Sequence, residues 1–396
     1  MEEGAIPSVA ARLALYQRAG GVITPLLTVL FAFFVGGLVV LVTTGKNPLH
    51  TYQAIFNGTG LNWFFPWVTC SDPCTPATNL QYTLLLATPL MLTGLAVAFA
   101  FRCGLFNIGG QGQYLVGAVA AVMIGSSFAD LSRWSHVALA VVVAAFAGAA
   151  WAGIAGFLKA TVGAHEVITT IMLNWIAIWI ATYLFEIGGP LQDPKQTGVP
   201  ISETVAESAK LPVFWGDPLF QGLHVGLFIA LGALVSYWIV LNRTTVGYEV
   251  RAVGFNPEAA RYGGISVARS YVLAMAISGL FAGLAGAVDV LGWEYRLGVL
   301  DIQISQVGFI GIAVALLGRN TAVGVFFSAI LFGALLNGTS TRNLDPEVFR
   351  PELASSLTLI IQGLVVLLVG ADVLVIYLWQ ARRKLGLGRK RASVTT

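Results

Sequence analysis

Three side-chain amides lie in a glycine-rich stretch at the start of an apolar segment. The stretch, GLFNIGGQGQ, begins at Gly104 and contains Asn107, Gln111 and Gln113. Polar groups are costly in hydrocarbon and usually face a bundle interior or a water-filled path, while glycines weaken regular helix. Broken helices with such residues recur at transporter binding sites. We therefore interpret these amides as the lining or gate of a solute path, with a helix-packing interface as the alternative.

A second set of polar residues shares one helical face. Glu166, Thr170 and Asn174 recur every four residues in a later apolar segment, so a helix places them on the same side. Asn174 lies deepest, whereas Glu166 stands near the segment's start, where it suits the positive end of a helix. Trp175 and Trp179 form either a flat surface for a ring or a lipid-facing pair.

The basic loop at 243–268 contains the pattern of a short capped helix. Asn256 is a favoured N-cap, Pro257 suits the first turn and Glu258 suits the positive helix end. The glycine pair that finishes at Gly264 would end the helix. Such a helix is either a docking site for a soluble partner or part of an ordinary solvated loop.

Small residues form a further helical face, and an acid follows it. Ser278, Gly279, Gly283 and Gly286 predict close packing between helices. Asp289 follows near the outer end of the same segment. It is interpreted as part of an entrance or as an anchor at the lipid headgroups.

The motifs of an enzyme are missing. The sequence has no Walker-type glycine loop with Lys-Ser/Thr and no His-Glu-x-x-His zinc motif. Its four histidines are scattered, and no Ser/His/Asp set has supporting local motifs. We therefore expect no catalytic, cofactor-binding or metal site on this chain.

Composition places these residues in a membrane protein. The 396 residues are 57% hydrophobic and only 10% charged, with 45 glycines. This composition is unlike that of a soluble enzyme or a nucleic-acid binder. A membrane span needs about 20 mainly apolar residues. The sequence predicts an all-α polytopic fold of about ten spans, with glycine-broken helices near the path, at 22–43, 81–101, 107–128, 136–158, 166–187, 222–241, 269–290, 302–318, 321–338 and 354–379.

Basic residues set the expected orientation. With the N-terminus in the cytoplasm, fifteen of the 22 Lys and Arg residues fall inside, as the positive-inside rule requires. Both termini are then cytoplasmic. The predicted organisation is a cytoplasmic segment at 1–21, a transmembrane domain at 22–379 with external loops at 44–80 and 188–221 and a cytoplasmic loop at 243–268, and a basic tail at 380–396.

Two cysteines lie in the first external loop. Cys70 and Cys74 are close enough in sequence for a small disulfide, which an oxidising exterior permits, and free thiols are the alternative. Asp372 lies inside the last predicted span, and its partner cannot be read from the sequence.

Four stretches in order resemble permease subunits of bacterial ABC importers of the ribose and branched-chain amino acid class, in the nucleoside and simple-sugar branch. They are GLFNIGGQGQ at 104–113, HEVITTIMLN at 165–174, GYEVRAVGFNPEAARYGGI at 247–265 and AVALLGRN at 313–320. The resemblance covers about residues 80–370. Gln111 and His165 depart from the Glu and Asn that are common in the family.

The resemblance implies a division of labour. A second permease subunit completes the path as a heterodimer, and a cytoplasmic ABC ATPase, commonly with two fused nucleotide-binding domains, hydrolyses ATP. An external binding protein, often a lipoprotein, delivers the substrate. The chain itself would lie in the plasma membrane, contact no nucleic acid and carry, like most of the branch, a nucleoside.

The resemblance also assigns roles to residues of this sequence. The substrate path would be lined or gated by Phe106, Asn107, Gln111, Gln113, Glu166, Thr170 and Asn174. The ATPase would couple through Gly254, Asn256, Pro257, Glu258, Ala259, Ala260, Arg261 and Gly264. Amides suit a neutral ribonucleoside, and an aromatic face such as that of Phe106 suits stacking on a base.

Two alternatives remain. The first is the same kind of importer with a sugar such as ribose, or a branched-chain amino acid, as its substrate. The second is an ion-coupled secondary carrier, which needs buried acids that bind and release cations. Its candidates in the sequence are Glu166, Asp289 and Asp372.

Overall fold

The computed structural model describes residues 29–42, 45, 47–66, 68, 74–216, 222–340, 359–360 and 363–364. The chain divides into two compact units, one of residues 1–48 with 359–396 and one of residues 49–358. In the first unit, the helix Val29–Val42 is apolar and falls within the first predicted span. Most of the last predicted span, the basic tail, Asp372 and Cys70 lie outside the described residues, so the Cys70–Cys74 pairing stays a prediction.

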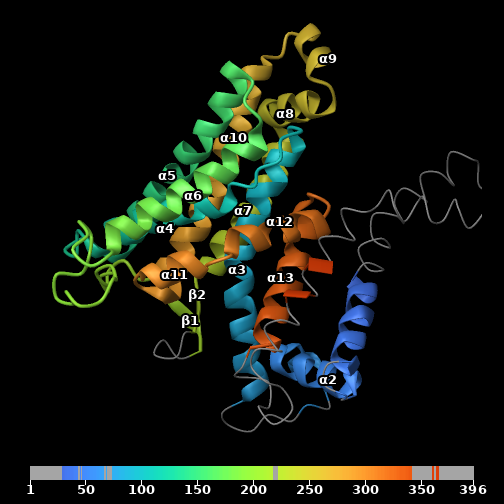
Figure 1. Ribbon diagram of the computed structural model, residues 1–396, viewed down its shortest axis with the longest axis vertical. Coiled ribbons are helices and arrows are strands. Elements are labelled where there is room, and N and C mark those ends of the chain that lie inside the picture. The colour runs from blue at the N-terminus through green and yellow to red at the C-terminus, as the bar shows by residue number, and fades with distance from the viewer. Residues whose placement is uncertain are drawn as a thin grey trace, which may run out of the picture. The chain divides into compact units, whose positions relative to one another are not determined.

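Helices make up most of the second unit (Figure 1). In chain order the elements are α2 (Pro48–Thr59), the 3-10 helix η1 (Leu61–Phe64), α3 (Thr75–Arg102), α4 (Gly110–Ser126), α5 (Arg133–Val162), α6 (Glu166–Phe185), β1 (Val213–Trp215), β2 (Leu223–His224), α7 (Gly226–Arg243), α8 (Thr245–Phe255), α9 (Pro257–Tyr262), α10 (Val267–Asp289), the π-helical η3 (Val290–Glu294), α11 (Val299–Ile304), α12 (Val307–Leu317) and α13 (Ala322–Gly338).

Six described helical segments are long and apolar enough to cross a membrane: α3, α5, α6, α7, α10 with η3, and α11 with α12. The all-α, polytopic membrane fold is therefore confirmed. Helix α13 is also apolar but shorter, at 17 residues. The total of about ten spans stays a prediction.

The predicted external loop at 44–80 is not simply a loop, because α2 and η1 lie within it. Helix α2 is too short and too polar to span a bilayer, but Thr51, Ile55 and Thr59 recur on one face and are buried. That face packs close to the end of α13, where a Cβ on Gly338 would press on the Ile55 carbonyl. The prediction missed this helix because it searched for spans.

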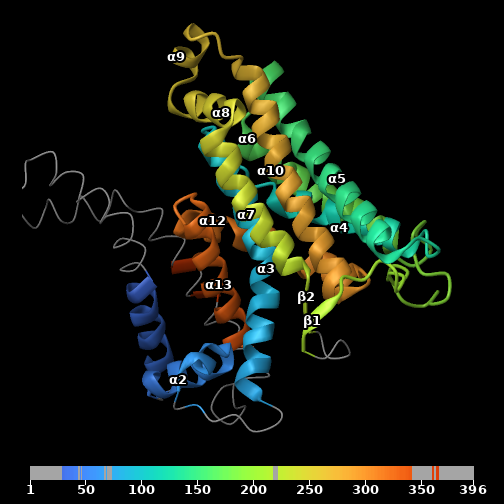
Figure 2. The same ribbon diagram turned by 180° about the vertical axis from the view of Figure 1, so that it is seen from behind.

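Helix α3 is the centre of the second unit. Its apolar window is 83% buried, against 28–61% for the other five spans. It packs against α10 on one side and against α12 and α13 on the other (Figures 1 and 2). A helix that is apolar all round is expected in such a buried position.

Glycines allow α10 to approach its neighbours closely. A Cβ on Gly279 would collide with the backbone of Gly148 in α5, and a Cβ on Gly283 would collide with Ala144. On the other side, a Cβ on Gly286 would collide with the Tyr114 carbonyl of α4. The predicted small-residue face is therefore confirmed as a packing surface.

A small antiparallel hairpin precedes α7: β1 lies in the predicted external loop at 188–221, and β2 replaces the first residues of the span predicted at 222–241. Strands β1 and β2 pair Val213 with His224. The imidazole of His224 is buried, its Nδ1 accepts a hydrogen bond from the Gly226 amide at 3.1 Å, and it lies directly against Gly292. Burial disfavours the imidazolium and lowers the pKa of His224 to about 4.

This buried histidine predicts a loss of stability in acid. An unfolded histidine has a pKa of about 6.5, so between pH 6.5 and 4 the unfolded chain binds a proton that the folded chain excludes. The stabilisation is complete above pH 6.5 and falls by about 3 kcal/mol as the pH drops toward 4. Thermal unfolding of the solubilised protein should therefore show a steeper acid decline than the His224→Gln variant.

The exposed His165, at the start of α6, provides the matched control as His165→Gln. Identical acid profiles for the wild type and His224→Gln, with His165→Gln also unchanged, would contradict this account of His224.

Candidate functional site

The backbone between α3 and α4 is irregular, as the glycine pattern predicts. Residues 103–109 are not helical, and Gly104 has a φ of +74°, a backbone angle that residues other than glycine rarely adopt. The Leu105 amide still reaches the Ala100 carbonyl at 3.1 Å. The remaining polar groups of the segment need side-chain partners, because unpaired backbone groups are costly at membrane depth.

Asn107 and Gln113 supply part of this pairing. Asn107 Nδ2 donates to Gln113 Oε1 at 2.9 Å, and Gln113 Nε2 donates back to Asn107 Oδ1 at 3.0 Å. Asn107 also donates to Ser278 Oγ of α10 at 2.7 Å and accepts from the Gly109 amide at 2.8 Å. Both amides are buried. In this conformation they join α4 to α10 rather than facing an open path.

Asn174 supports the same irregular segment from α6. Its Oδ1 accepts from the Gly112 amide at 2.8 Å, and its Nδ2 donates to the Ile108 carbonyl at 2.9 Å. A Cβ on Gly112 would crowd the Asn174 backbone, so the glycine is what brings the two helices together. Asn174 therefore fixes the start of α4 against α6.

Gln111 links α4 to the second break in the helices. The segment α11–α12 is interrupted at Ser305 and Gln306, and Gln111 Oε1 accepts from the Gly308 amide at 2.8 Å. A Cβ on Gly308 would collide with the Gln111 backbone, so α4 and α12 begin side by side. Gln111 Nε2 is buried without a hydrogen-bond partner among the described residues. Such an orphan donor costs about 1–3 kcal/mol.

A partly open groove of about 600 Å³ lies beside this junction, between α6 and the α11–α12 break. Amides, a hydroxyl and aromatic rings line it together. The lining residues are Ile171, Asn174, Trp175, Ile178, Trp179, Gln303, Ser305, Gln306 and Phe309. Asn174 is the one predicted path residue in this lining. It stands next to Trp175 and Trp179, for which the sequence allowed two interpretations, a flat surface for a ring or a lipid-facing pair.

The other predicted path residues lie apart from the groove. Phe106 stacks on Phe101, with ring centroids 4.9 Å apart. Glu166 pairs with Lys159 of α5, with Nζ and Oε2 2.8 Å apart. Thr170 is buried and donates to the Glu166 carbonyl of its own helix at 2.8 Å. Glu166, Thr170 and Asn174 do lie on one helix, as predicted, but only Asn174 reaches the groove.

Asp289 lies neither in an entrance nor at the headgroups, because it is buried between α10 and α4. The Tyr114 hydroxyl and the Trp293 indole N–H both donate to its carboxylate. Sequence alone placed it at an exposed end since its partners are 175 and four residues away. The carboxylate thus ties the π-helical end of α10 to α4.

The predicted capped helix in the loop is confirmed as α9. Asn256 Oδ1 accepts from the amides of Glu258 and Ala259, both at 3.0 Å, and Gly263 follows the last turn. Glu258 and Arg261 form an exposed ion pair at 3.5 Å, which contributes little by itself.

Two exposed aromatic side chains stand near the ends of α9, Phe255 just before it and Tyr262 as its last residue, and the sequence analysis missed both. Phe255 is 91% exposed and Tyr262 is 93% exposed. At such exposure the two rings belong to no packed core and are available to a partner. Their spacing carries no signal in the sequence, because an aromatic residue is usually buried.

Helix α8 connects this surface to the irregular segment. A Cβ on Gly254 would collide with the Arg102 carbonyl at the end of α3. A Cβ on Gly104 would stand only 3.4 Å from the Gly254 Cα. The loop with α9 therefore rests directly on the residues that lead into the Asn107 network.

Comparisons with known proteins agree on one family. The family model described as "Branched-chain amino acid transport system / permease component" matches residues 79–370. The chain is 40% identical to the guanosine ABC transporter permease protein NupP of Bacillus subtilis, over 84% of this chain and 89% of the relative. It is 36% identical to the glucose ABC transporter permease protein TsgB13 of Haloferax volcanii, over 87% and 86%.

A further relative comes from the same Bacillus as the first. The guanosine ABC transporter permease protein NupQ is 28% identical over 63% of this chain and 78% of the relative. No solved structure matches the chain.

Proposed function

Because this chain belongs to the family of permease components of branched-chain amino acid transport systems, we propose that it is a permease subunit of an ATP-driven importer of nucleosides. The observation that carries the substrate proposal is the groove beside Asn174, which joins indole rings to amides. A nucleoside has the matching parts: a flat base that stacks on rings and polar groups that bond to amides.

The groove has room for a small molecule, and its chemistry favours a nucleoside over the sugar alternative. A groove of about 600 Å³ is within the usual range for small-molecule sites. Relatives at similar identity are named for guanosine and for glucose. Trp175 and Trp179 favour the base-containing substrate, because base–aromatic stacking adds about 1–3 kcal/mol per base.

We place the path on the groove side of the α4–α12 junction. In the conformation described, the amides of Asn107, Gln111 and Gln113 are engaged with protein partners. Separation of α4 from α12 would free Gln111 Oε1 and present its unpaired Nε2 to a solute. The predicted lining role thus becomes a gating role for these three amides and a direct contact for Asn174.

The coupling route follows the packing. An ATPase that closes on α9 would push α8, and Gly254 of α8 rests on Arg102 and Gly104. These residues lead into the segment that Asn107 and Asn174 hold. Such a ligand-biased two-state change is how alternating access couples distant sites.

We also propose the partner subunits and the orientation of the chain. The second permease is a related but different chain, as the two guanosine permeases of Bacillus subtilis support. A cytoplasmic ATPase and an external binding protein complete the importer. About ten spans with both termini cytoplasmic place α9 on the ATPase side and the β1–β2 hairpin on the other, at opposite ends of the unit (Figure 1).

Uptake by the complete importer tests this function. Cells that express the chain with its partner subunits should accumulate labelled guanosine, and excess unlabelled nucleosides should compete while glucose and ribose should not. Uptake should stop on ATP depletion and persist when ion gradients are collapsed. Uptake of labelled glucose or ribose with no uptake of guanosine would establish the sugar alternative, and dependence on an ion gradient would establish the secondary carrier.

A further inference from the structure

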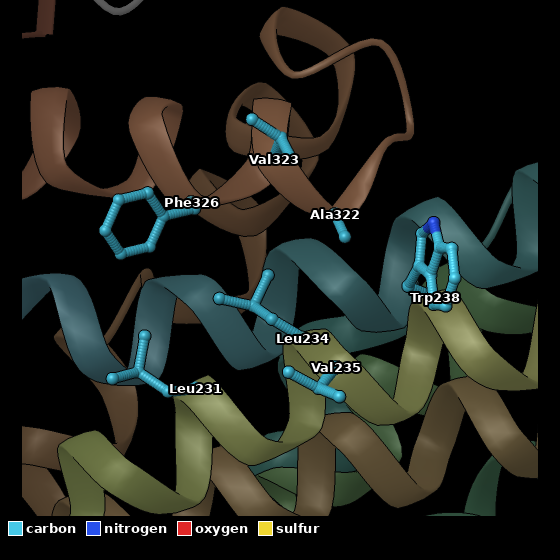
Figure 3. Close-up of a pocket in the computed structure, with 7 residues that line it drawn as sticks. All are labelled: Leu231, Leu234, Val235, Trp238, Ala322, Val323 and Phe326. Atoms are coloured by element: carbon cyan, nitrogen blue, oxygen red, sulfur yellow. The ribbon is translucent and has the colours of Figure 1, made fainter.

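A second groove, wholly apolar in its lining, lies between α7 and α13 (Figure 3). Its volume is about 360 Å³, and it is lined by Leu231, Leu234, Val235, Trp238, Ala322, Val323 and Phe326. From Leu231 to Trp238 it follows α7 for about 10 Å. No polar side chain contributes to the lining except the indole, so the groove has nothing to offer the proposed polar substrate.

One end of this groove is basic. Trp238 and Ala322 lie at that end (Figure 3), and the guanidinium of Arg243 lies over the Trp238 ring, with its carbon 5.4 Å from the ring centroid. Arg243 is exposed, and no carboxylate in the described part of the chain pairs with it. Helix α13 begins at the same end, after its N-cap Thr321, and helix N-termini favour anions.

We propose that this groove holds an acyl chain of an anionic phospholipid whose phosphate contacts Arg243. The apolar lining matches a hydrocarbon chain along its length, and the cation stands where the chain would meet its headgroup. Stacking on Trp238 fixes the guanidinium in that position. In the orientation proposed above, this end faces the cytoplasmic leaflet, where anionic lipids concentrate.

The charge at one end distinguishes this groove from ordinary lipid-facing surface. Exposed apolar side chains occur on other spans, such as Val142 and Phe146 on α5, but they line no comparable groove with a cation at its end among the described cavities. A neutral lipid would fill the groove equally well with its acyl chain. The discriminating contact is therefore the one between Arg243 and the phosphate.

Lipid retention by the purified full-length permease tests the site without requiring transport. The protein is placed in nanodiscs of equal phosphatidylglycerol and phosphatidylcholine, then recovered in detergent, and the retained lipids are counted by native mass spectrometry. The wild type should retain phosphatidylglycerol preferentially. Arg243→Gln should lower that preference about fivefold, since one basic residue contributes about 1 kcal/mol to anionic lipid binding.

Two matched pairs separate the site from its surroundings. Val235→Trp fills the groove and should abolish the retained lipid, whereas Val142→Trp on α5 should not; the two valines are 58% and 50% exposed. Arg133→Gln, at the exposed start of α5, is the control for Arg243→Gln.

Equal retention within either pair would overturn the proposal. Unchanged lipid retention in Val235→Trp would overturn it as well, even if the variant were less stable. Because retention is measured on the isolated permease, failure here is distinguishable from failure of the proposed transport function.

Discussion

Replacing Phe255 and Tyr262 together with alanine is expected to abolish ATP-driven uptake while leaving the permease folded. The two rings are almost fully exposed near the two ends of α9, so their removal costs the isolated chain little. At an interface, a buried aromatic anchor typically contributes about 2 kcal/mol or more, or roughly thirtyfold in affinity. Loss of two anchors should therefore detach the ATPase or leave it uncoupled.

Three measurements on the complete importer check this result: co-purification of the ATPase, substrate-stimulated ATP hydrolysis and uptake. Tyr183→Ala, which removes another exposed tyrosine near the end of α6, is the matched control and should behave as the wild type. Normal co-purification and coupling in the double variant would place the ATPase elsewhere on the chain and remove the proposed role of the loop.

Trp179→Ala is expected to lower nucleoside uptake about tenfold. Trp179 lines the groove beside Asn174 and is 61% exposed, so it can stack on a base without any rearrangement of the core. Loss of one stacking contact of about 1–3 kcal/mol predicts a reduction of roughly five- to more than a hundredfold, and tenfold lies toward the lower end of that range. Trp179→Phe keeps an aromatic face and should retain most of the uptake.

Trp134 gives the comparison that separates stacking from a lipid-facing role. It is 66% exposed at the start of α5 and lies outside the groove lining, so Trp134→Ala should not change uptake in membranes with equal amounts of importer. Equal effects of Trp134→Ala and Trp179→Ala would show that the indole of Trp179 serves the bilayer and not the substrate.

Local signals in the sequence were enough to predict α9 and the small-residue face of α10. The cap of α9 acts over two and three residues, from Asn256 to the amides of Glu258 and Ala259. The packing face of α10 is a repeat within one helix, so Gly279 and Gly283 could be recognised without knowing their partners. Both predictions rest on rules that operate within a few turns of chain.

The state of the amides depends on long-range contacts and could not be predicted. Asn107 meets Ser278, which is 171 residues away, and Gln111 meets Gly308, which is 197 residues away. The residue types indicated that these amides would be buried and polar. Only the packed structure shows that Asn107 pairs with Gln113, and that Gln111 bonds to Gly308 while its Nε2 has no partner among the described residues.

The groove between α6 and the α11–α12 break could not be predicted for a related reason. The break between α11 and α12 lies at Ser305 and Gln306 rather than at a glycine or proline, so the sequence predicted one continuous span at 302–318. Gln303 and Gln306 therefore fell inside a predicted span and were not identified as lining residues. Their position beside α6 follows from how α11 packs.

The adjoining starts of α4 and α12 have an electrical consequence for the cell. Each helix carries a partial positive charge at its N-terminus, and the contact between Gln111 and Gly308 brings the two ends together. A cation that enters between them meets two like charges and no carboxylate in the groove lining, whereas a neutral solute meets only dipoles. An importer that opens at this junction would pass its cargo while the membrane keeps its proton and sodium gradients.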